Sequence, residues 1–426
     1  MTEAMSQAEG SGAPVRVLHV FRYFQPDFTG EGLYFAKLAP HLAALGVQCD
    51  VAVAARDSAP TVPPPAGVGA VHRLVDEATQ AHAWGNRRLL AWLMANARCY
   101  HAVHFHSLVD RLFLPQLLAR LSFCRVVQSA TLDDGLGMIV DSYKPHGRFF
   151  VRRFCRLIDR AVTISPRLYD DSLRVLPRDR VSLIPQGVNR RVFAVAPEVR
   201  AAARAAFGLA PDDVVLLFVG GLCERKDVAF LLDAMPAAPA GGKRLRLLVV
   251  GPDLERDYAR RLRDRAPALG QGTVIFTGYL ADPAQAYAAA DAFVFASRDE
   301  GFGNVLIEAM AAGLPVVARH LPGVTDSFIR DGETGFLFSD AASYDSIVRR
   351  LVDDRGLRER VGRAACDASA DYDLEAVAAR YADVYRGVLE TGGVDQPSVP
   401  VVGSAADRPQ AAALDVGLVR RNRSVP

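Results

Sequence analysis

Two glutamates flank the start of an expected helix and could hold the two ends of an extended polar ligand. Glu300 lies in a loop after a strand that ends near Ala296, and Glu308 lies more than one turn inside a helix expected over 304–312. At a rise of about 1.5 Å per residue, with the loop added, the carboxylates should lie on the order of 10 Å apart. That distance is too long for an acid and a base acting on one bond. Between them, the helix N-terminus offers unpaired N–H groups that suit a phosphate.

Glu308 could instead be an ordinary charge on a solvated helix face. Its neighbours Ile307, Ala309 and Met310 make this helix largely apolar. A carboxylate in such surroundings needs a partner, so we favour a binding role for Glu308.

A second polar loop follows a strand that ends in Gly220 and Gly221. It carries Arg225 and Lys226 before a helix that begins near Asp227, a suitable N-cap residue. A lysine in such a loop can reach an anion held at a neighbouring helix start. The alternative is a solvent-facing Arg-Lys pair. We favour a binding role because the chain has only four lysines: Lys37, Lys144, Lys226 and Lys243.

Apolar runs that alternate with helix-like stretches should position these loops. In the second half, the runs end in Gly220, Gly251 and Gly278, at intervals of about 30 residues that suit successive βαβ units. The first half shows the same alternation. The pattern predicts an α/β protein with two doubly wound parallel sheets, whose ligand binds at the carboxyl ends of strands and in the cleft between the sheets.

The sequence predicts that the chain is divided into five segments. A disordered N-terminal tail (1–14) precedes a first domain (15–195) and a second domain (196–370), and the length of 426 residues suits two domains. An amphipathic helix follows (371–392). The remainder (393–426) is rich in Gly, Ala, Pro, Ser and Val, which indicates a disordered tail.

Composition argues against several classes of protein. Fifty basic residues stand against 48 acidic ones, and a net charge of +2 indicates no nucleic-acid partner. The six cysteines form no C-x-x-C pair, which indicates buried thiols in a reducing compartment. Residues 1–14 have no basic residue and no apolar stretch, so they are no secretory signal. No segment is apolar enough to span a membrane. We therefore expect a cytoplasmic protein, at most peripheral to the inner face of a membrane.

Several segments resemble the retaining glycosyltransferases of family 4, which have the GT-B fold and use nucleotide-sugar donors. The pair Glu300 and Glu308 matches the E-x7-E motif of that family, and the residues after it match E-A-M-A-x-G-x-P-V-V. The likeness covers about residues 15–390. It implies two facing Rossmann-like domains, with the last helix crossing back to the first. The other matching segments are 26–32, 101–106, 184–189, 220–227 and 331–337.

The resemblance implies a role for each matching residue on the donor side. Glu308 would bind the ribose hydroxyls, Glu300 would hold hydroxyls of the donor sugar, and Lys226 would pair with the diphosphate. The base would face Tyr279 and Leu280. Gly30 lies in the glycine-rich first loop. The diphosphate would bind the backbone of Phe302, Gly303, Asn304, Val305 and Leu306.

The resemblance also implies a reaction that needs no metal ion and no other cofactor. Retaining transfer in this family is described as front-face attack, in which the leaving phosphate helps to take the acceptor proton. Lys226 and the helix terminus would stabilise the negative charge that grows on the diphosphate. The chain has no D-x-D motif, since Asp133 and Asp134 are adjacent.

The sequence departs from the family at two places. An arginine commonly follows the strand-end glycine, whereas this chain has Gly221, and Arg225 could substitute for it. A first-domain histidine often lies where this chain has Thr131, so the catalytic residue of that domain stays open between Thr131, Asp133 and His106. We expect His104 and His106 to point to opposite faces of their strand, so that only one reaches the cleft.

A basic and apolar segment, 148–160, admits two interpretations. Its composition suits a helix that lies on an anionic membrane. We favour the alternative, an ordinary helix that packs Phe149, Phe150, Phe154 and Ile158 into the first domain.

The resulting hypothesis is a retaining glycosyltransferase with a nucleoside diphosphate sugar as donor and a glycan, a lipid-linked intermediate or a small metabolite as acceptor. One alternative is a GT-B enzyme that modifies a sugar nucleotide, such as an epimerase. Another is a binder of nucleotide sugar without catalysis. A dinucleotide-dependent oxidoreductase is disfavoured, because no G-x-G-x-x-G follows the first strand.

Overall fold

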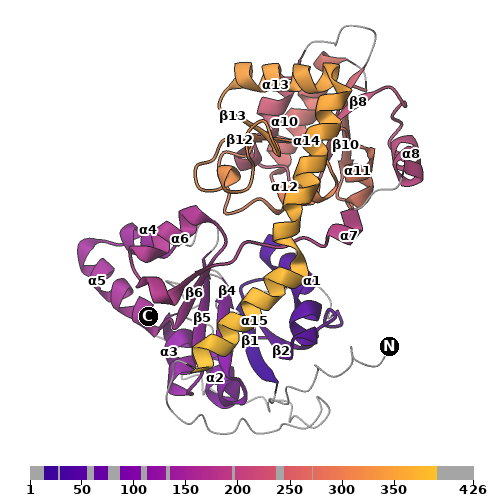
Figure 1. Ribbon diagram of the computed structural model, residues 1–426. Helices are drawn as coiled ribbons and strands as arrows, with labels where there is room; N and C mark the ends of the chain where they lie inside the picture. The colour runs from indigo at the N-terminus through magenta and orange to yellow at the C-terminus, as the bar shows by residue number, and fades with distance from the viewer. Residues whose placement is uncertain are drawn as a thin grey trace, which may run out of the picture.

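The computed structural model describes two lobes joined by a short connection, with a long helix running from the second lobe onto the first (Figure 1). The residues described are 14–26, 29–54, 62–74, 87–106, 113–130, 135–193, 197–236, 244–270 and 272–390. Thr131, Asp133 and the segment 393–426 lie outside them, as does nearly all of 1–14.

The first lobe contains a parallel sheet of seven described strands in the order β3-β2-β1-β4-β5-β6-β7. The strands are β1 (Val15–Phe21), β2 (Val47–Val53), β3 (Val68–Arg73), β4 (Ala102–His106), β5 (Arg125–Ala130), β6 (Arg160–Thr163) and β7 (Val181–Leu183). The helices around it are α1 (Gly30–Ala44), α2 (Arg87–Asn96), α3 (Phe113–Leu121), α4 (Leu136–Ser142), α5 (Pro145–Phe154) and α6 (Pro166–Leu173). Chain order reverses between β1 and β4, so this lobe is doubly wound, as predicted.

The second lobe repeats this plan with six described strands in the order β10-β9-β8-β11-β12-β13. The strands are β8 (Val214–Val219), β9 (Leu245–Val250), β10 (Val274–Gly278), β11 (Ala292–Phe295), β12 (Val316–Arg319) and β13 (Gly335–Phe338). The helices are α8 (Pro197–Ala206), α9 (Val228–Asp233), α10 (Arg256–Arg265), α11 (Ala284–Ala289), α12 (Asn304–Ala311), α13 (Ala341–Asp353) and α14 (Arg355–Ala368). The central strands are buried on both faces, which explains their nearly continuous apolar sequences.

Two short contacts join the lobes at the chain connection. Helix α7 (Arg190–Phe193) follows β7, and α15 (Leu374–Glu390) returns to pack on α1 of the first lobe. Val188 N–H donates to the carbonyl of Tyr372 at 2.8 Å, and Leu374 N–H donates to the carbonyl of Val188 at 3.2 Å. Both ends of the second lobe are therefore tied together where the chain passes between the lobes.

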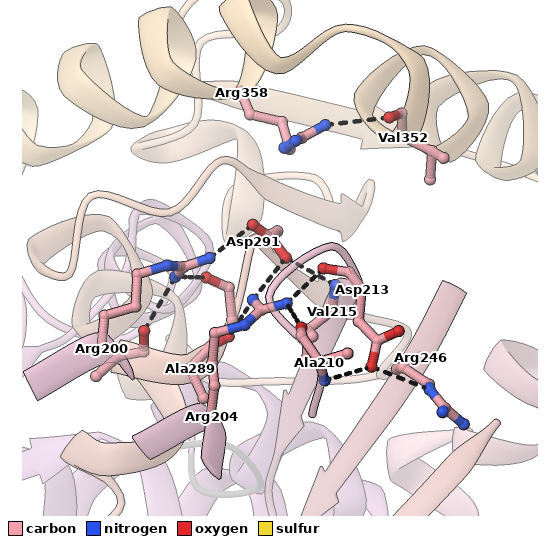
Figure 2. A network of polar contacts seen from close by, with 12 residues as sticks. Arg200, Arg204, Ala210, Asp213, Val215, Arg246, Ala289, Asp291, Val352 and Arg358 are labelled. Carbon is pink, nitrogen blue, oxygen red and sulfur yellow. Dashed lines mark hydrogen bonds and ion pairs between the residues drawn. The ribbon is translucent and has the colours of Figure 1, made fainter. Parts of the chain in front are cut away.

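A partly buried ion network secures α8 at the amino ends of β8 and β11 (Figure 2). Asp291 accepts hydrogen bonds from Arg200 at 2.7 Å, from Arg204 at 3.2 Å and from Val215 N–H at 2.8 Å. Arg204 also donates to the carbonyl of Asp213 at 2.5 Å. Since ligands of open α/β sheets bind at the carboxyl ends of strands, this network serves the structure of the lobe and leaves the opposite edge for chemistry.

Helix α5 corrects the expected packing of the segment 148–160. No side chain of α5 is buried, and Phe149 and Phe150 are 68% and 58% exposed. Other residues of the segment pack inward: Val151 is partly buried against the core, the Phe154 ring stacks on Phe113 at 3.9 Å, and Ile158 is fully buried. The segment is helical as far as Phe154, as predicted, but its two adjacent phenylalanines face outward.

Candidate active site

The start of α12 is built around a glycine. Gly303 is the N-cap residue and has a φ of 97°, and a Cβ there would lie 2.9 Å from Leu306 Cδ1. Phe302 and Leu306 are buried on either side of it. Asn304 Oδ1 and Ser297 Oγ are buried with no hydrogen-bond partner among the described residues. Because unpaired buried polar atoms are costly, a bound ligand or water would stabilise this turn.

Glu300 lies in the loop before α12 and is held by two cations. The residue is 7% exposed, and Arg225 Nη1 lies 2.9 Å from Glu300 Oε1. The Lys226 amine donates to the same oxygen and lies 5.6 Å from the centre of the Phe295 ring. The Lys226 side chain is only 15% exposed. Lys226 therefore faces the loop that leads into α12 and not bulk water, which the sequence interpretation required.

Asp227 precedes α9 as expected, but its side chain does not cap that helix. It has a φ of 51°, and its carboxylate accepts hydrogen bonds from Arg298 at 2.9 and 3.0 Å and from Arg319 at 2.9 Å. The backbone N–H of Arg298 also donates to the carbonyl of Arg225 at 2.9 Å. These contacts tie the loop that carries Lys226 to the loop that carries Glu300.

Glu308 has the partners that its apolar surroundings require. The Tyr287 hydroxyl of α11 donates to Glu308 Oε2 at 2.9 Å. Burial, followed by the nearby negative charge of Glu308, raises the pKa of Tyr287 well above its usual value, so this hydroxyl stays protonated. Lys37 Nζ of α1 lies 3.2 Å from the other carboxylate oxygen. This ion pair joins α1 of the first lobe to α12 of the second.

Arg167 of α6 supports the Glu300 loop from the first lobe. Its guanidinium donates to Asp299 Oδ1 and to the carbonyl of Glu300, both at 2.8 Å. Its backbone N–H donates to the carbonyl of Gly323 at 3.2 Å. The residues Lys37, Arg167, Glu300 and Glu308 define what we call the lobe junction. Sequence reasoning missed Lys37, Arg167 and Tyr287, although the scarcity of lysine was a signal for Lys37.

A group of three buried histidines lies in the first lobe and corrects the expectation for His104 and His106. The two rings lie on the same face of β4, with centres 4.2 Å apart, because residues two apart in a strand share a face. His19 of β1 pairs in register with His104, and its Nδ1 lies 3.0 Å from His106 Nε2. His106 Nδ1 lies 3.2 Å from Glu31, and His104 lies between Tyr385 and Ser129 at 2.8 and 2.9 Å.

These histidines predict a loss of stability in acid. Burial lowers the pKa of His106 from 6.5 to about 3, and it lowers the pKa values of His19 and His104 too. The unfolded chain therefore binds more protons than the folded chain below pH 6.5, and stability falls from there toward pH 3. At pH 5, His106 alone should cost about 2 kcal/mol relative to pH 7.

Thermal unfolding of the wild type and of His106→Gln between pH 7 and pH 5 checks this expectation. The variant should lose less of its stability over this range, whatever its stability at pH 7. An equal loss in both proteins would contradict the assignment.

The same three histidines form a group that could hold a metal ion. One ring nitrogen from each lies within 4.8 Å of the others. However, both ring nitrogens of His104 and of His106 already have protein partners. Of the ring nitrogens of these three histidines, His19 Nε2 is the one without a partner among the described residues. A cavity of about 20 Å³ beside His19 and Glu31 has room for one water molecule. These contacts do not require a metal ion at this place.

The other expected site residues lie as follows. Leu254 Cδ1 would be 2.3 Å from a Cβ at Gly221, so it occupies the space that a side chain there would need. Tyr279 is 55% exposed, and Leu280 is partly buried against the core of the second lobe. Gly30 begins α1, whose N-cap Thr29 accepts a hydrogen bond from Gly32 N–H at 3.2 Å. His106 is buried in the histidine group behind Glu31.

The protein has two Rossmann-like lobes, and basic side chains and the N-terminus of a helix lie where the lobes meet. This arrangement places it in the class of GT-B glycosyltransferases. Residues 28–191 match the family described as Glycosyltransferase Family 4, and residues 213–354 match Glycosyl transferases group 1. D-inositol 3-phosphate glycosyltransferase of Streptomyces bingchenggensis is 30% identical over 410 residues, which cover 86% of this chain and 87% of that protein. The chain belongs to glycosyltransferase family 4 and is a glycosyltransferase.

Solved structures confirm the fold. Anabaena HepE in complex with UDP and glucose superposes with a TM-score of 0.73 at 19% identity, covering 88% of this chain and 100% of that one. Sucrose-phosphate synthase of Thermosynechococcus elongatus has a TM-score of 0.71 at 24% identity, with the same coverage. Among the described residues, no helix is long and apolar enough to cross a membrane.

Proposed function

We propose that this glycosyltransferase takes its sugar from a nucleoside diphosphate sugar bound at the lobe junction and transfers it with retention of anomeric configuration. The observation that carries the proposal is the convergence of Arg225 and Lys226 on Glu300, beside the N-terminus of α12. Two cations and the free N–H groups of a helix start suit a diphosphate, and they stabilise it most when it leaves with added charge.

Each donor-site residue has one role in this proposal. The diphosphate binds Lys226 and the backbone of Phe302 to Leu306, and Glu300 then turns its carboxylate to hydroxyls of the sugar. Glu308 accepts hydrogen bonds from the ribose, while the Tyr287 hydroxyl keeps the Glu308 carboxylate in place. Tyr279 and Leu280 face the base. Asn304 Oδ1, unpaired among the described residues, would gain a donor from the ligand.

Transfer breaks the bond between the anomeric carbon and the phosphate oxygen, and the electron pair stays on the leaving diphosphate. An acceptor hydroxyl forms the new bond on the same face of the sugar, and its proton passes to the leaving oxygen. We propose that no metal ion takes part, since Lys226, Arg225 and the helix N-terminus supply the positive charge.

The comparisons suggest a first donor and leave three classes of acceptor. HepE was solved with UDP and glucose and with UDP-glucose, so uridine diphosphate is the first nucleotide to test. The acceptor is a glycan, a lipid-linked intermediate or a small metabolite, and the relative named for D-inositol 3-phosphate supports the last class. We place the enzyme in the cytoplasm, where a reducing environment suits its six free thiols. A lipid-linked acceptor would bring it to the inner face of the membrane.

Thermal unfolding, measured in the presence of EDTA and of each of several nucleoside diphosphates in turn, tests the donor site. The diphosphates of uridine, guanosine, adenosine and thymidine are compared. The preferred one should add about 2.7 kcal/mol of stability at a hundredfold excess over its Kd. Glu308→Ala should remove most of this shift, because the ribose loses its hydrogen-bond acceptor.

Glu359→Ala is the matched control, since Glu359 is another helical glutamate of the second lobe and its ion-pair partner among the described residues is the solvent-exposed Arg355, at 2.8 Å. It should keep the full shift. A full shift in Glu308→Ala would refute the ribose contact, and a shift that needs a divalent metal would refute the metal-free site.

A further inference from the structure

The outward side of α5 combines adjacent aromatic rings with a cluster of positive charges. Phe149 and Phe150 are both more than half exposed, and their rings meet edge to face with centres 5.8 Å apart. Single exposed apolar residues are common, but two neighbouring phenyl rings on one exposed helix require an explanation. We call this outward side, with Arg148, Phe149, Phe150, Arg152 and Arg153, the α5 face.

The charge around these rings has one sign. The segment 144–156 contains five basic residues and no acidic one: Lys144, Arg148, Arg152, Arg153 and Arg156. All five are exposed. Arg148 donates to the carbonyls of Tyr143 at 2.7 Å and Asp141 at 2.9 Å, which ties the start of α5 to the end of α4. The nearby acidic residue Asp141 is already paired with Arg174.

Helical geometry places the rings and the arginines on one side. At 100° per residue, Phe149, Phe150, Arg152 and Arg153 span about 160° of the helix circumference, and Arg148 lies just beyond this arc, where its guanidinium binds the carbonyls of Tyr143 and Asp141. The partly buried residues of the helix, Gly147, Val151 and Phe154, lie on the opposite side. Rings and guanidinium groups can therefore meet one surface at the same time.

We propose that the α5 face binds the surface of a bilayer that contains anionic lipid. The phenyl rings would enter the boundary between headgroups and acyl chains, and the arginines would pair with lipid phosphates. An acidic protein or a nucleic acid would satisfy the charges alone, whereas a membrane surface satisfies both the charges and the rings. The α5 helix packs on α4, α4 packs on α6, and α6 carries Arg167. Binding would thus bring the first lobe against the membrane through a helix that α4 separates from α6 and Arg167.

Co-sedimentation of the full chain with lipid vesicles tests this proposal. Vesicles of phosphatidylcholine alone are compared with vesicles that also contain phosphatidylglycerol, at low and at high salt. We expect binding only to the anionic vesicles, weakening as salt rises. Phe149→Ser with Phe150→Ser should lower the affinity by about tenfold or more, and Arg152→Gln with Arg153→Gln by about 10- to 30-fold.

The control removes the same net charge from an exposed pair in the second lobe, Arg260→Gln with Arg261→Gln on α10. It should bind as the wild type does. All substituted side chains are exposed, and the nucleotide-induced thermal shift verifies that each variant folds. Equal loss in the α10 control, no loss in the phenylalanine variant, or no binding to anionic vesicles would each overturn the proposal, as would binding to RNA or polyglutamate in place of vesicles.

Discussion

Lys226→Ala should lower kcat for sugar transfer by about 10²- to 10³-fold. The amine lies in a nearly buried position between Glu300 and the Phe295 ring, in a loop tied to the start of α12. In the proposed reaction, positive charge there would stabilise the leaving diphosphate more than the bound donor, so kcat should fall more than KM rises. Steady-state kinetics of nucleoside diphosphate release, measured with and without acceptor, give both constants.

Arg265→Ala is a suitable control for this experiment. Arg265 is a cation of the same lobe that also pairs with a carboxylate, that of Asp233, but on an exposed surface. Its loss should leave kcat within about twofold of the wild type. If Lys226→Ala retains more than about a tenth of the wild-type kcat, the amine does not serve the leaving group.

Arg167→Ala should lower kcat/KM by on the order of 10- to 100-fold, although Arg167 is expected to touch neither donor nor acceptor. Its guanidinium holds Asp299 and the carbonyl of Glu300 from across the lobe junction. Without it, the loop that carries Glu300 loses two charge-assisted hydrogen bonds. We therefore interpret Arg167 as a positioning residue.

Arg167→Lys separates positioning from bulk charge, because a lysine cannot make both bonds in the geometry of a guanidinium. It should recover only part of the lost activity. Arg174→Ala is the matched control: Arg174 is the C-cap residue of α6 and pairs with Asp141 and Asp171 away from the junction. Equal losses in Arg167→Ala and Arg174→Ala would indicate a general effect on α6 and contradict the positioning role.

Local sequence was sufficient to predict the conformation of the two polar loops and of the helix that follows Glu300. The loop that carries Glu300, the glycine turn and α12 follow one another directly after β11, over residues 296–311, and such a strand-loop-helix unit has few possible shapes. The loop with Arg225 and Lys226 is equally local. Glycines at turns and apolar strands set these conformations through short-range sterics and burial, so they could be predicted without knowing what lay opposite.

Contacts between distant segments could not be predicted in this way. Lys37 and Glu308 are 271 residues apart, and Arg167 and Asp299 are 132 apart. Their pairing depends on how two separate sheets are placed, which neither lobe encodes alone. The shared face of His104 and His106 does follow from the period of a strand, and the expectation of opposite faces was an error of reasoning.

The sequence by itself therefore determined the two doubly wound sheets, the two polar loops and the motif that marks the family. Only the tertiary structure decided which first-lobe residues reach the donor loops and which side of α5 meets solvent. Periodicity shows that a helix is amphipathic, but the surface that covers its apolar side is set by packing over the whole chain. For α5, that packing leaves Phe149 and Phe150 without a cover within the described protein, and for Glu308 it supplies Lys37 from the other lobe.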